Sequence, residues 1–127
     1  MKYTIEQDRS KGICVIRISG EHKRPEDSFV LQGIALDIRR QTGCTSFLYD
    51  MRGATITGKT MDILDTAEAP AKQGYARDYT IALVYSGDME DHAFMETVSV
   101  NHGYSLRVFS HIEEARLWLS SKMSTST

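Results

Sequence analysis

The sequence predicts an α/β fold with one mostly parallel β-sheet, an N-terminal β-hairpin and about four helices, in the order ββαβαβαβα. Short β-branched or aromatic stretches alternate with longer stretches of helical periodicity, and strands that alternate with helices imply a parallel sheet. The chain from Tyr104 to Leu119 shows one such unit most clearly. Its 127 residues fit one domain, and we expect residues 1–120 to form it, followed by a frayed polar tail at 121–127.

The N-terminal hairpin is predicted from two strand-like stretches, residues 2–7 and 13–19. The polar stretch between them ends in Gly12, which favours a tight connection. The second strand reads ICVIRIS. It is apolar on both faces, which is typical of a strand covered on two sides. Residues 20–24 are polar and are interpreted as a link to the first helix.

The first helix is predicted to open at Pro25, because proline lacks the N–H that would find no partner in a first helical turn. Gly43 is the expected C-terminal stop. Five apolar residues recur at helical spacing and form the predicted core-facing stripe: Val30, Leu31, Ile34, Ala35 and Ile38.

The middle of the chain contains two more predicted strands, residues 45–50 and 79–85, and two more predicted helices. The stretch MRGATITG, residues 51–58, is interpreted as a loop. Thr57 or Thr60 would then cap the second helix, which Pro70 should kink or end before Gly74. The third helix is expected at residues 89–102.

The closing unit begins with a strand at residues 104–109 and continues into a fourth helix. Ser110 and Glu113 have the spacing of a capping box, in which each side chain accepts from the backbone N–H of the other residue. The residues Ile112, Ala115, Trp118 and Leu119 form one apolar stripe on that helix.

Composition excludes several classes of protein. The 15 basic and 17 acidic residues give a net charge of −2, which argues against a general nucleic-acid binder. No apolar run approaches the roughly 20 residues that span a bilayer, so no membrane insertion is expected. Cys14 and Cys44 are expected to be thiols in a reducing, cytoplasmic setting. No spacing of histidine and cysteine matches a metal motif, and no cofactor is predicted.

The chain resembles the STAS-like family of small α/β domains, which includes the bacterial anti-sigma-factor antagonists. The resemblance depends on the early hairpin, the strand ending in Asp50, the strand IALVY and the closing segment. That segment is most similar to an uncharacterised branch of the family, through Leu106-Arg107-Val108-Phe109, Glu113-Glu114-Ala115 and Trp118-Leu119. The resemblance implies a regulatory, non-catalytic domain that binds proteins.

The antagonist branch carries Asp-x-Ser at the end of a strand and a phosphorylated serine at the start of the next helix. Asp50 matches the aspartate, but Arg52 stands where the first serine would be. Lys59 falls near the phosphorylation position, with Thr60 beside it. Thr57 or Thr60 could accept a phosphate at a helix N-terminus, although plain helix capping is the simpler role of both residues.

Ligands of open parallel sheets bind near the carboxyl ends of the strands, so candidate binding residues are sought there. The predicted ligand- or partner-binding set is Asp50, Met51, Arg52, Thr57, Lys59, Thr60 and Tyr85. The first hypothesis is a regulatory interaction domain with a protein partner, or with itself as a homodimer. The alternative is a carrier of a small apolar, lipid-like ligand, with a pocket between the second and third helices. No residue set predicts a catalytic centre.

Overall fold

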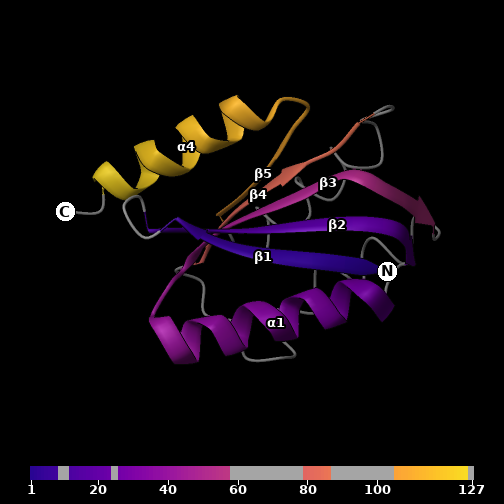
Figure 1. The fold of residues 1–127 in the computed structure, drawn as a ribbon. Coiled ribbons are helices and arrows are strands. Elements are labelled where there is room, and N and C mark those ends of the chain that lie inside the picture. Colours follow the sequence, from indigo (N-terminus) through magenta and orange to yellow (C-terminus); the bar gives the residue numbers. More distant parts are fainter. Residues whose placement is uncertain (9–11, 24–25, 58–78, 87–104, 126–127) are drawn as a thin grey trace.

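The computed structural model describes residues 1–8, 12–23, 26–57, 79–86 and 105–125. They form five strands and two helices, shown in Figure 1: β1 (Lys2–Asp8), β2 (Ile13–Lys23), α1 (Glu26–Thr42), β3 (Ser46–Thr57), β4 (Thr80–Val84), β5 (Ser105–Phe109) and α4 (Ile112–Thr125). The helices predicted between residues 57 and 74 and at 89–102 lie outside the described residues.

The five strands form one sheet in the order β1-β2-β3-β4-β5. β1 pairs with β2 in antiparallel fashion, from Lys2 opposite Ser19 to Asp8 opposite Ile13. The pairs β2–β3, β3–β4 and β4–β5 are all parallel. The predicted mixed, mostly parallel sheet with an N-terminal hairpin is therefore confirmed.

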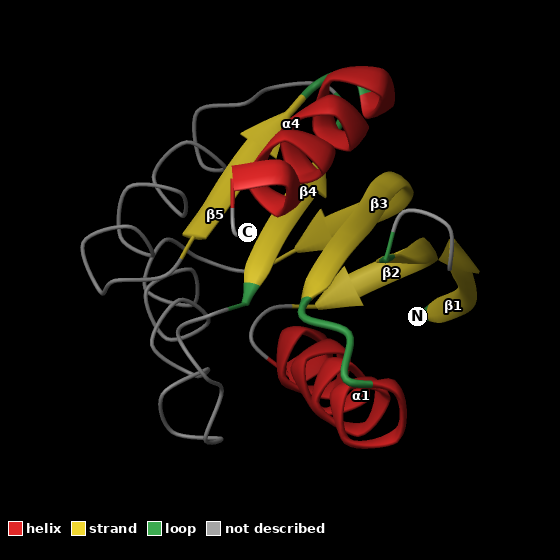
Figure 2. Cartoon of the chain, turned by 90° about the vertical axis from the view of Figure 1, so that its left-hand side faces the viewer, coloured by secondary structure: helices red, strands yellow, loops and turns green. Residues whose placement is uncertain are grey.

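The helices α1 and α4 lie on opposite faces of the sheet, as Figures 1 and 2 show. The core on the α1 side contains buried residues from four elements: Cys14, Ile16, Ile18, Leu31, Ala35, Ile38, Phe47, Tyr49, Met51, Ile81, Leu83 and others. The core on the α4 side is smaller and contains Ile13, Val15, Leu48, Ala82, Val84, Phe109, Ala115 and Leu119. β2 contributes to both cores, as its two apolar faces predicted.

Helix α1 stops before Gly43 as the sequence predicted, whereas Pro25, the predicted first residue, lies outside the described residues. The Asp27 carboxylate accepts the backbone N–H of Lys23 at 2.7 Å, just before the helix. At the other end, Gly43 adopts a φ of 78° and its N–H donates to the Arg39 carbonyl at 2.8 Å. A left-handed residue at this position satisfies a terminal carbonyl and favours glycine.

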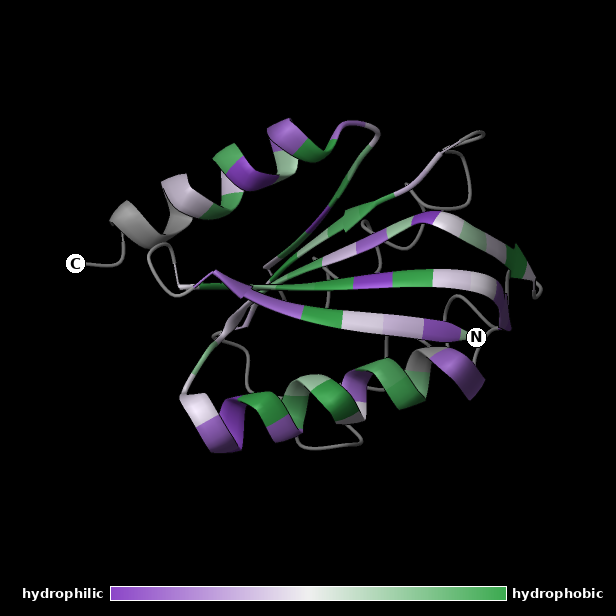
Figure 3. Cartoon of the chain, in the orientation of Figure 1, coloured by the Kyte–Doolittle hydropathy of each residue, from purple (hydrophilic) through white to green (hydrophobic). Residues whose placement is uncertain are grey.

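Green and purple bands alternate along α1 in Figure 3, as expected of a helix with one buried face. Leu31, Ala35 and Ile38 are buried in the core, and Ile34 packs against it. The prediction was wrong for Val30, which is 49% exposed. Val30 lies at the margin of the apolar stripe, and the sequence alone does not show how far the cover by the sheet extends around the helix.

Both β2 and β3 are longer than predicted. The polar stretch after residue 19 is strand as far as Lys23, and the predicted loop after Asp50 is strand as far as Thr57. These two extensions pair with each other, from Ser19 opposite Gly53 to Lys23 opposite Thr57. β4 ends opposite Asp50, so the extensions form a two-stranded segment, called here the β2–β3 ribbon.

A β-bulge lies where the β2–β3 ribbon begins. From Arg17 to Ser19 the register advances two residues in β2, whereas their partners Asp50 and Gly53 are three residues apart in β3. The extra residue therefore belongs to β3 and reverses the facing of the residues that follow it. Gly53 suits this point because a Cβ there would lie 3.3 Å from the Ile18 carbonyl oxygen.

Helix α4 covers β3, β4 and β5 on the second face of the sheet. Ala115 and Leu119 are fully buried, and Ile112 and Trp118 pack beside them, which confirms the predicted stripe. The helix begins at Ile112, so His111 rather than Ser110 precedes its first residue. It continues to Thr125, beyond Ser120, where the sequence indicated its end.

The two cysteines differ in their environment, which gives a first testable prediction. Both are free thiols; Cys14 is buried and Cys44 is partly exposed. Burial raises the pKa of Cys14 to about 11, so the thiolate that alkylating reagents attack is scarce at neutral pH. We expect iodoacetamide to label Cys44 in the native protein while Cys14 stays unlabelled until urea unfolds the chain. Peptide mass spectrometry would show this, and equal labelling of both thiols would contradict it.

Candidate functional site

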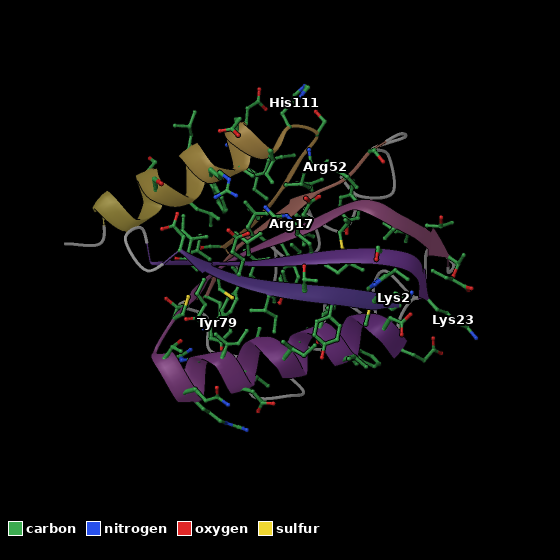
Figure 4. The ribbon with its side chains drawn as sticks, viewed as in Figure 1. Lys2, Arg17, Lys23, Arg52, Tyr79 and His111 are labelled. Atoms are coloured by element: carbon green, nitrogen blue, oxygen red, sulfur yellow. The ribbon has the colours of Figure 1, made fainter. Side chains whose placement is uncertain are left out.

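Asp50 lies on the α4 side of the sheet, at the point where β4 ends and the β2–β3 ribbon begins. Its neighbours on the same face of β3 are the buried Leu48 and, within the bulged segment, Arg52. Figure 4 shows Arg17 and Arg52 on this side of the sheet and Tyr79 on the α1 side. The side chain of Asp50 is only 8% exposed, so its charge requires partners within the protein.

Arg52 supplies most of these partners. Its Nε donates to Asp50 Oδ1 and its Nη2 donates to Asp50 Oδ2, both at 2.8 Å. The backbone N–H of Arg52 also donates to Oδ1, at 3.2 Å. Two parallel N–H···O bonds between a guanidinium and a carboxylate fix the orientation of both groups. Arg52 is within this reach because residues two apart in a strand lie on the same face.

Arg17 of β2 extends the pairing across the sheet. Its Nε lies 3.9 Å from Asp50 Oδ2, and its Nη1 forms an ion pair with Glu6 Oε2 of β1. The four residues Glu6, Arg17, Asp50 and Arg52 thus form one line of alternating charge over β1, β2 and β3, called here the charged row. Neither Arg17 nor Glu6 was among the site residues predicted from the sequence. A signal was present, because Arg17 is the one charge within a strand predicted to be covered on both faces.

The pairing changes the proton affinities of its members. The Arg52 guanidinium, through its hydrogen bonds, lowers the pKa of Asp50, and this effect outweighs burial, which acts in the opposite direction. The Asp50 carboxylate in turn raises the pKa of Arg52. Asp50 is therefore a carboxylate at neutral pH with both oxygens engaged, and such a group is a weak general base.

The guanidinium groups of the charged row remain accessible. The side chains of Arg52 and Arg17 are each 44% exposed, although each is anchored on the buried Asp50. A guanidinium carries five N–H donors, and Asp50 accepts only two from the side chain of Arg52. The remaining donors can contact a carboxylate, a phosphate or a carbonyl group of another molecule. The charged row is thus suited to polar recognition.

The other predicted site residues do not join the charged row. Met51 and Tyr85 are each 3% exposed and belong to the core on the α1 side, so they face away from Asp50 and Arg52. Thr57 is the exposed last residue of β3, and its Oγ1 lies 3.4 Å from Glu21 Oε1. Lys59 and Thr60 lie outside the described residues.

Ser86, which follows β4, lies close to the charged row, because its Oγ is 3.5 Å from the backbone oxygen of Arg52.

Within the part of the chain that the structure describes, no three His, Cys, Asp or Glu side chains are grouped as a metal ion would require. Among the same residues, no helix is both long and apolar enough to cross a membrane. The part of β3 beside the end of β4 offers guanidinium N–H donors and a fixed ion pair.

An antiparallel edge strand on a parallel sheet, with helices on both faces, agrees with the STAS-like fold that the sequence resemblance implied. Comparison with solved structures confirms this fold. The unphosphorylated form of the anti-sigma factor antagonist SpoIIAA superposes with a TM-score of 0.55 at 13% identity, over 90% of this chain and 94% of that one. The phosphorylated form of the Bacillus cell fate determinant SpoIIAA gives 0.50 at 10% identity, over 89% and 96%.

A protein of the DUF3478 family from Shewanella loihica PV-4, uncharacterized and with a SpoIIAA-like fold, is also similar. Its TM-score is 0.57 at 16% identity, and the match covers 93% of this chain and 92% of that one. No family model matches the sequence, and no curated protein matches it either. At these identities the similarity establishes the fold, and the role of the chain has to be argued from its own residues.

Proposed function

We propose that this chain is a non-catalytic regulatory domain that binds a protein partner through the charged row and the β2–β3 ribbon. The observation that carries the proposal is the bidentate Asp50–Arg52 pair. A buried carboxylate holds a half-exposed guanidinium in one orientation, so little side-chain freedom remains to be lost when a partner binds. Arginine is enriched where binding energy is concentrated in protein interfaces.

The position of this pair supports the proposal. SpoIIAA, whose fold this chain shares, is named as an antagonist of an anti-sigma factor, and its structure is known with and without phosphate. The sequence resemblance matches Asp50 to the aspartate of the Asp-x-Ser motif of that family, with Arg52 at the position of its serine. Here the polar group offered there is a cation, so we propose a partner surface that carries carboxylates.

Control by phosphorylation is a narrower proposal and concerns Thr57 and Thr60. Thr57 is exposed but lies beside the Glu21 carboxylate, and a phosphate there would repel that charge. Thr60 is therefore the better candidate of the two. Tyr85 and Met51, being buried, would support the binding surface from beneath, whereas Lys59 would add a second cation to it.

The test is partner capture with matched arginine variants. We expect the immobilised wild-type chain to retain a partner from an extract of its own cells, and Arg52→Gln to reduce that retention by about tenfold or more. Arg40→Gln is the control, because Arg40 is a 74%-exposed arginine of α1 whose ion pair with Asp37 is on the surface. Equal retention by all three folded proteins would contradict the proposal.

Native mass spectrometry of the protein purified from the same cells decides between this proposal and the alternative. The pocket of the alternative would lie between helices predicted outside the described residues. A stoichiometric apolar molecule on a monomer would favour the ligand carrier. An added phosphate that is absent from Thr60→Ala would support the narrower proposal.

A further inference from the structure

β1 is a long edge strand with an open outer side. It is paired only on its β2 side in the described sheet, and all seven of its residues pair in unbroken register, with no bulge. Six of the seven are exposed. The outer backbone N–H and C=O groups of such a strand form a template for another strand, and natural edges are usually shortened, bulged or broken by proline. β1 is neither short nor bulged and contains no proline, but it carries charged side chains, which also protect natural edges.

The side chains of β1 divide cleanly between the two faces. Lys2, Thr4 and Glu6 alternate on the α4 face, as the ion pair of Glu6 with Arg17 shows. Tyr3 and Ile5 lie on the α1 face, opposite core residues of β2, yet they are 45% and 44% exposed. Two large apolar side chains on the edge strand are thus only about half covered by the domain.

We infer that β1 pairs with β1 of a second copy of this chain, in antiparallel fashion about a two-fold axis at Thr4. In this register Lys2 lies opposite Glu6 of the second copy, and Tyr3 lies opposite Ile5 of the second copy. The two-fold axis repeats both contacts. Opposite charges and aromatic–aliphatic pairs directly across strands stabilise a sheet, so the strand is complementary to itself on both faces.

The neighbouring register is less favourable. An axis at Ile5 would keep Lys2 opposite an acidic residue, Asp8, and Ile5 opposite Ile5. It would, however, place Tyr3 opposite Gln7 and Glu6 opposite Thr4, so the apolar pairing of Tyr3 and the charge pairing of Glu6 would both be lost. In the register at Thr4, Glu6 lies between Arg17 of its own chain and Lys2 of the second copy. The charged row would then continue across the dimer, and two five-stranded sheets would join into one.

Charge reversal tests the pairing without touching the core. Lys2→Glu places two acidic residues opposite each other, and Glu6→Lys places two basic residues opposite each other. We expect each variant to dissociate at least about tenfold more readily than the wild type. Mixed in equal amounts, the two variants restore both opposite-charge contacts and should form a heterodimer. Lys23→Glu, which reverses an exposed lysine at the far end of β2, is the control and should dimerise as the wild type does.

Sedimentation equilibrium measures the dissociation of these dimers. The protein concentration should extend from about 1 µM to about 1 mM, because interfaces that bury less than roughly 1,200 Å² are weak. Circular dichroism checks that the variants fold; Lys2→Glu leaves the ion pair of Glu6 with Arg17 intact. A wild type that stays monomeric throughout this range overturns the inference. Dimers that either charge reversal leaves unchanged, or a mixture that fails to recover, overturn it as well. Capture of a partner by Arg52 is a separate measurement, so the two proposals can fail independently.

Discussion

Replacing Leu119 by alanine is expected to lower the free energy of unfolding by about 2–5 kcal/mol. Leu119 is fully buried in the core on the α4 side, where it packs with Ala115 and Phe109. Truncation removes apolar contacts and leaves a cavity that a close-packed interior fills only in part. Because α4 is the described helix on this face of the sheet, weaker packing at Leu119 also weakens the cover over Val15 and Leu48.

Leu117→Ala is the matched control for this prediction. Leu117 lies on the same helix, two residues earlier, but is 71% exposed. The same substitution there changes helix propensity by a few tenths of a kcal/mol and creates no cavity. Urea denaturation of both variants measures the difference directly. Similar losses at the two positions would mean that α4 does not dock through the face that contains Leu119.

The burial of a residue, or its place in a strand, could be predicted from the sequence where the local pattern allows only one interpretation. Ala115 and Leu119 are four residues apart, which is the spacing of one helical face, and both are buried. The hairpin of β1 and β2 follows from two alternating stretches around Gly12. Such patterns are local, so no knowledge of the sheet order is required to interpret them.

The β2–β3 ribbon could not be predicted in the same way. Gly20 and Gly53 are typical of turns, and both were interpreted as marks of a link or loop. In addition, the bulge changes which residues of β3 face the core on the α1 side. Before the bulge these are odd-numbered, such as Met51, and after it they are even-numbered, such as Ala54 and Ile56. A strand with a bulge shows no single period of two along its sequence, so its second half resembles an irregular segment.

Part of the candidate site could be predicted because it lies beside a strand that is recognisable from its local pattern. Asp50 and Arg52 were found because they follow an apolar strand, where parallel sheets place their functional groups. Met51 and Tyr85 were included by proximity in sequence, but strand alternation places them on the other face. Arg17 and Glu6 were missed because the pairing of β1 with β2, and of β2 with β3, which joins them to Asp50, is a long-range property of the sheet.

Asp50→Asn is expected to lower the free energy of unfolding by about 1.5–3 kcal/mol at pH 7, the usual contribution of hydrogen bonds to a charged group. The asparagine side chain has nearly the same shape, but its NH₂ group would face the N–H donors of Arg52. Arg52 and Arg17 would then keep their charges beside a buried neutral amide. Asp37→Asn is the control: Asp37 forms an exposed ion pair with Arg40, and such pairs contribute about 0–1 kcal/mol.

The difference between the wild type and Asp50→Asn should also depend on pH. The folded state lowers the pKa of Asp50 below its usual value of about 3.9, mainly through the hydrogen bonds from Arg52. A lowered pKa stabilises the fold fully above the unfolded-state value, and this stabilisation is lost as the pH falls through the folded-state value. The difference should therefore be constant from about pH 5 to 8 and should shrink below about pH 4. Urea titrations at pH 3, 4, 5 and 7 would measure it, and a difference of the same size at every pH would show that the Asp50 charge does not stabilise the site.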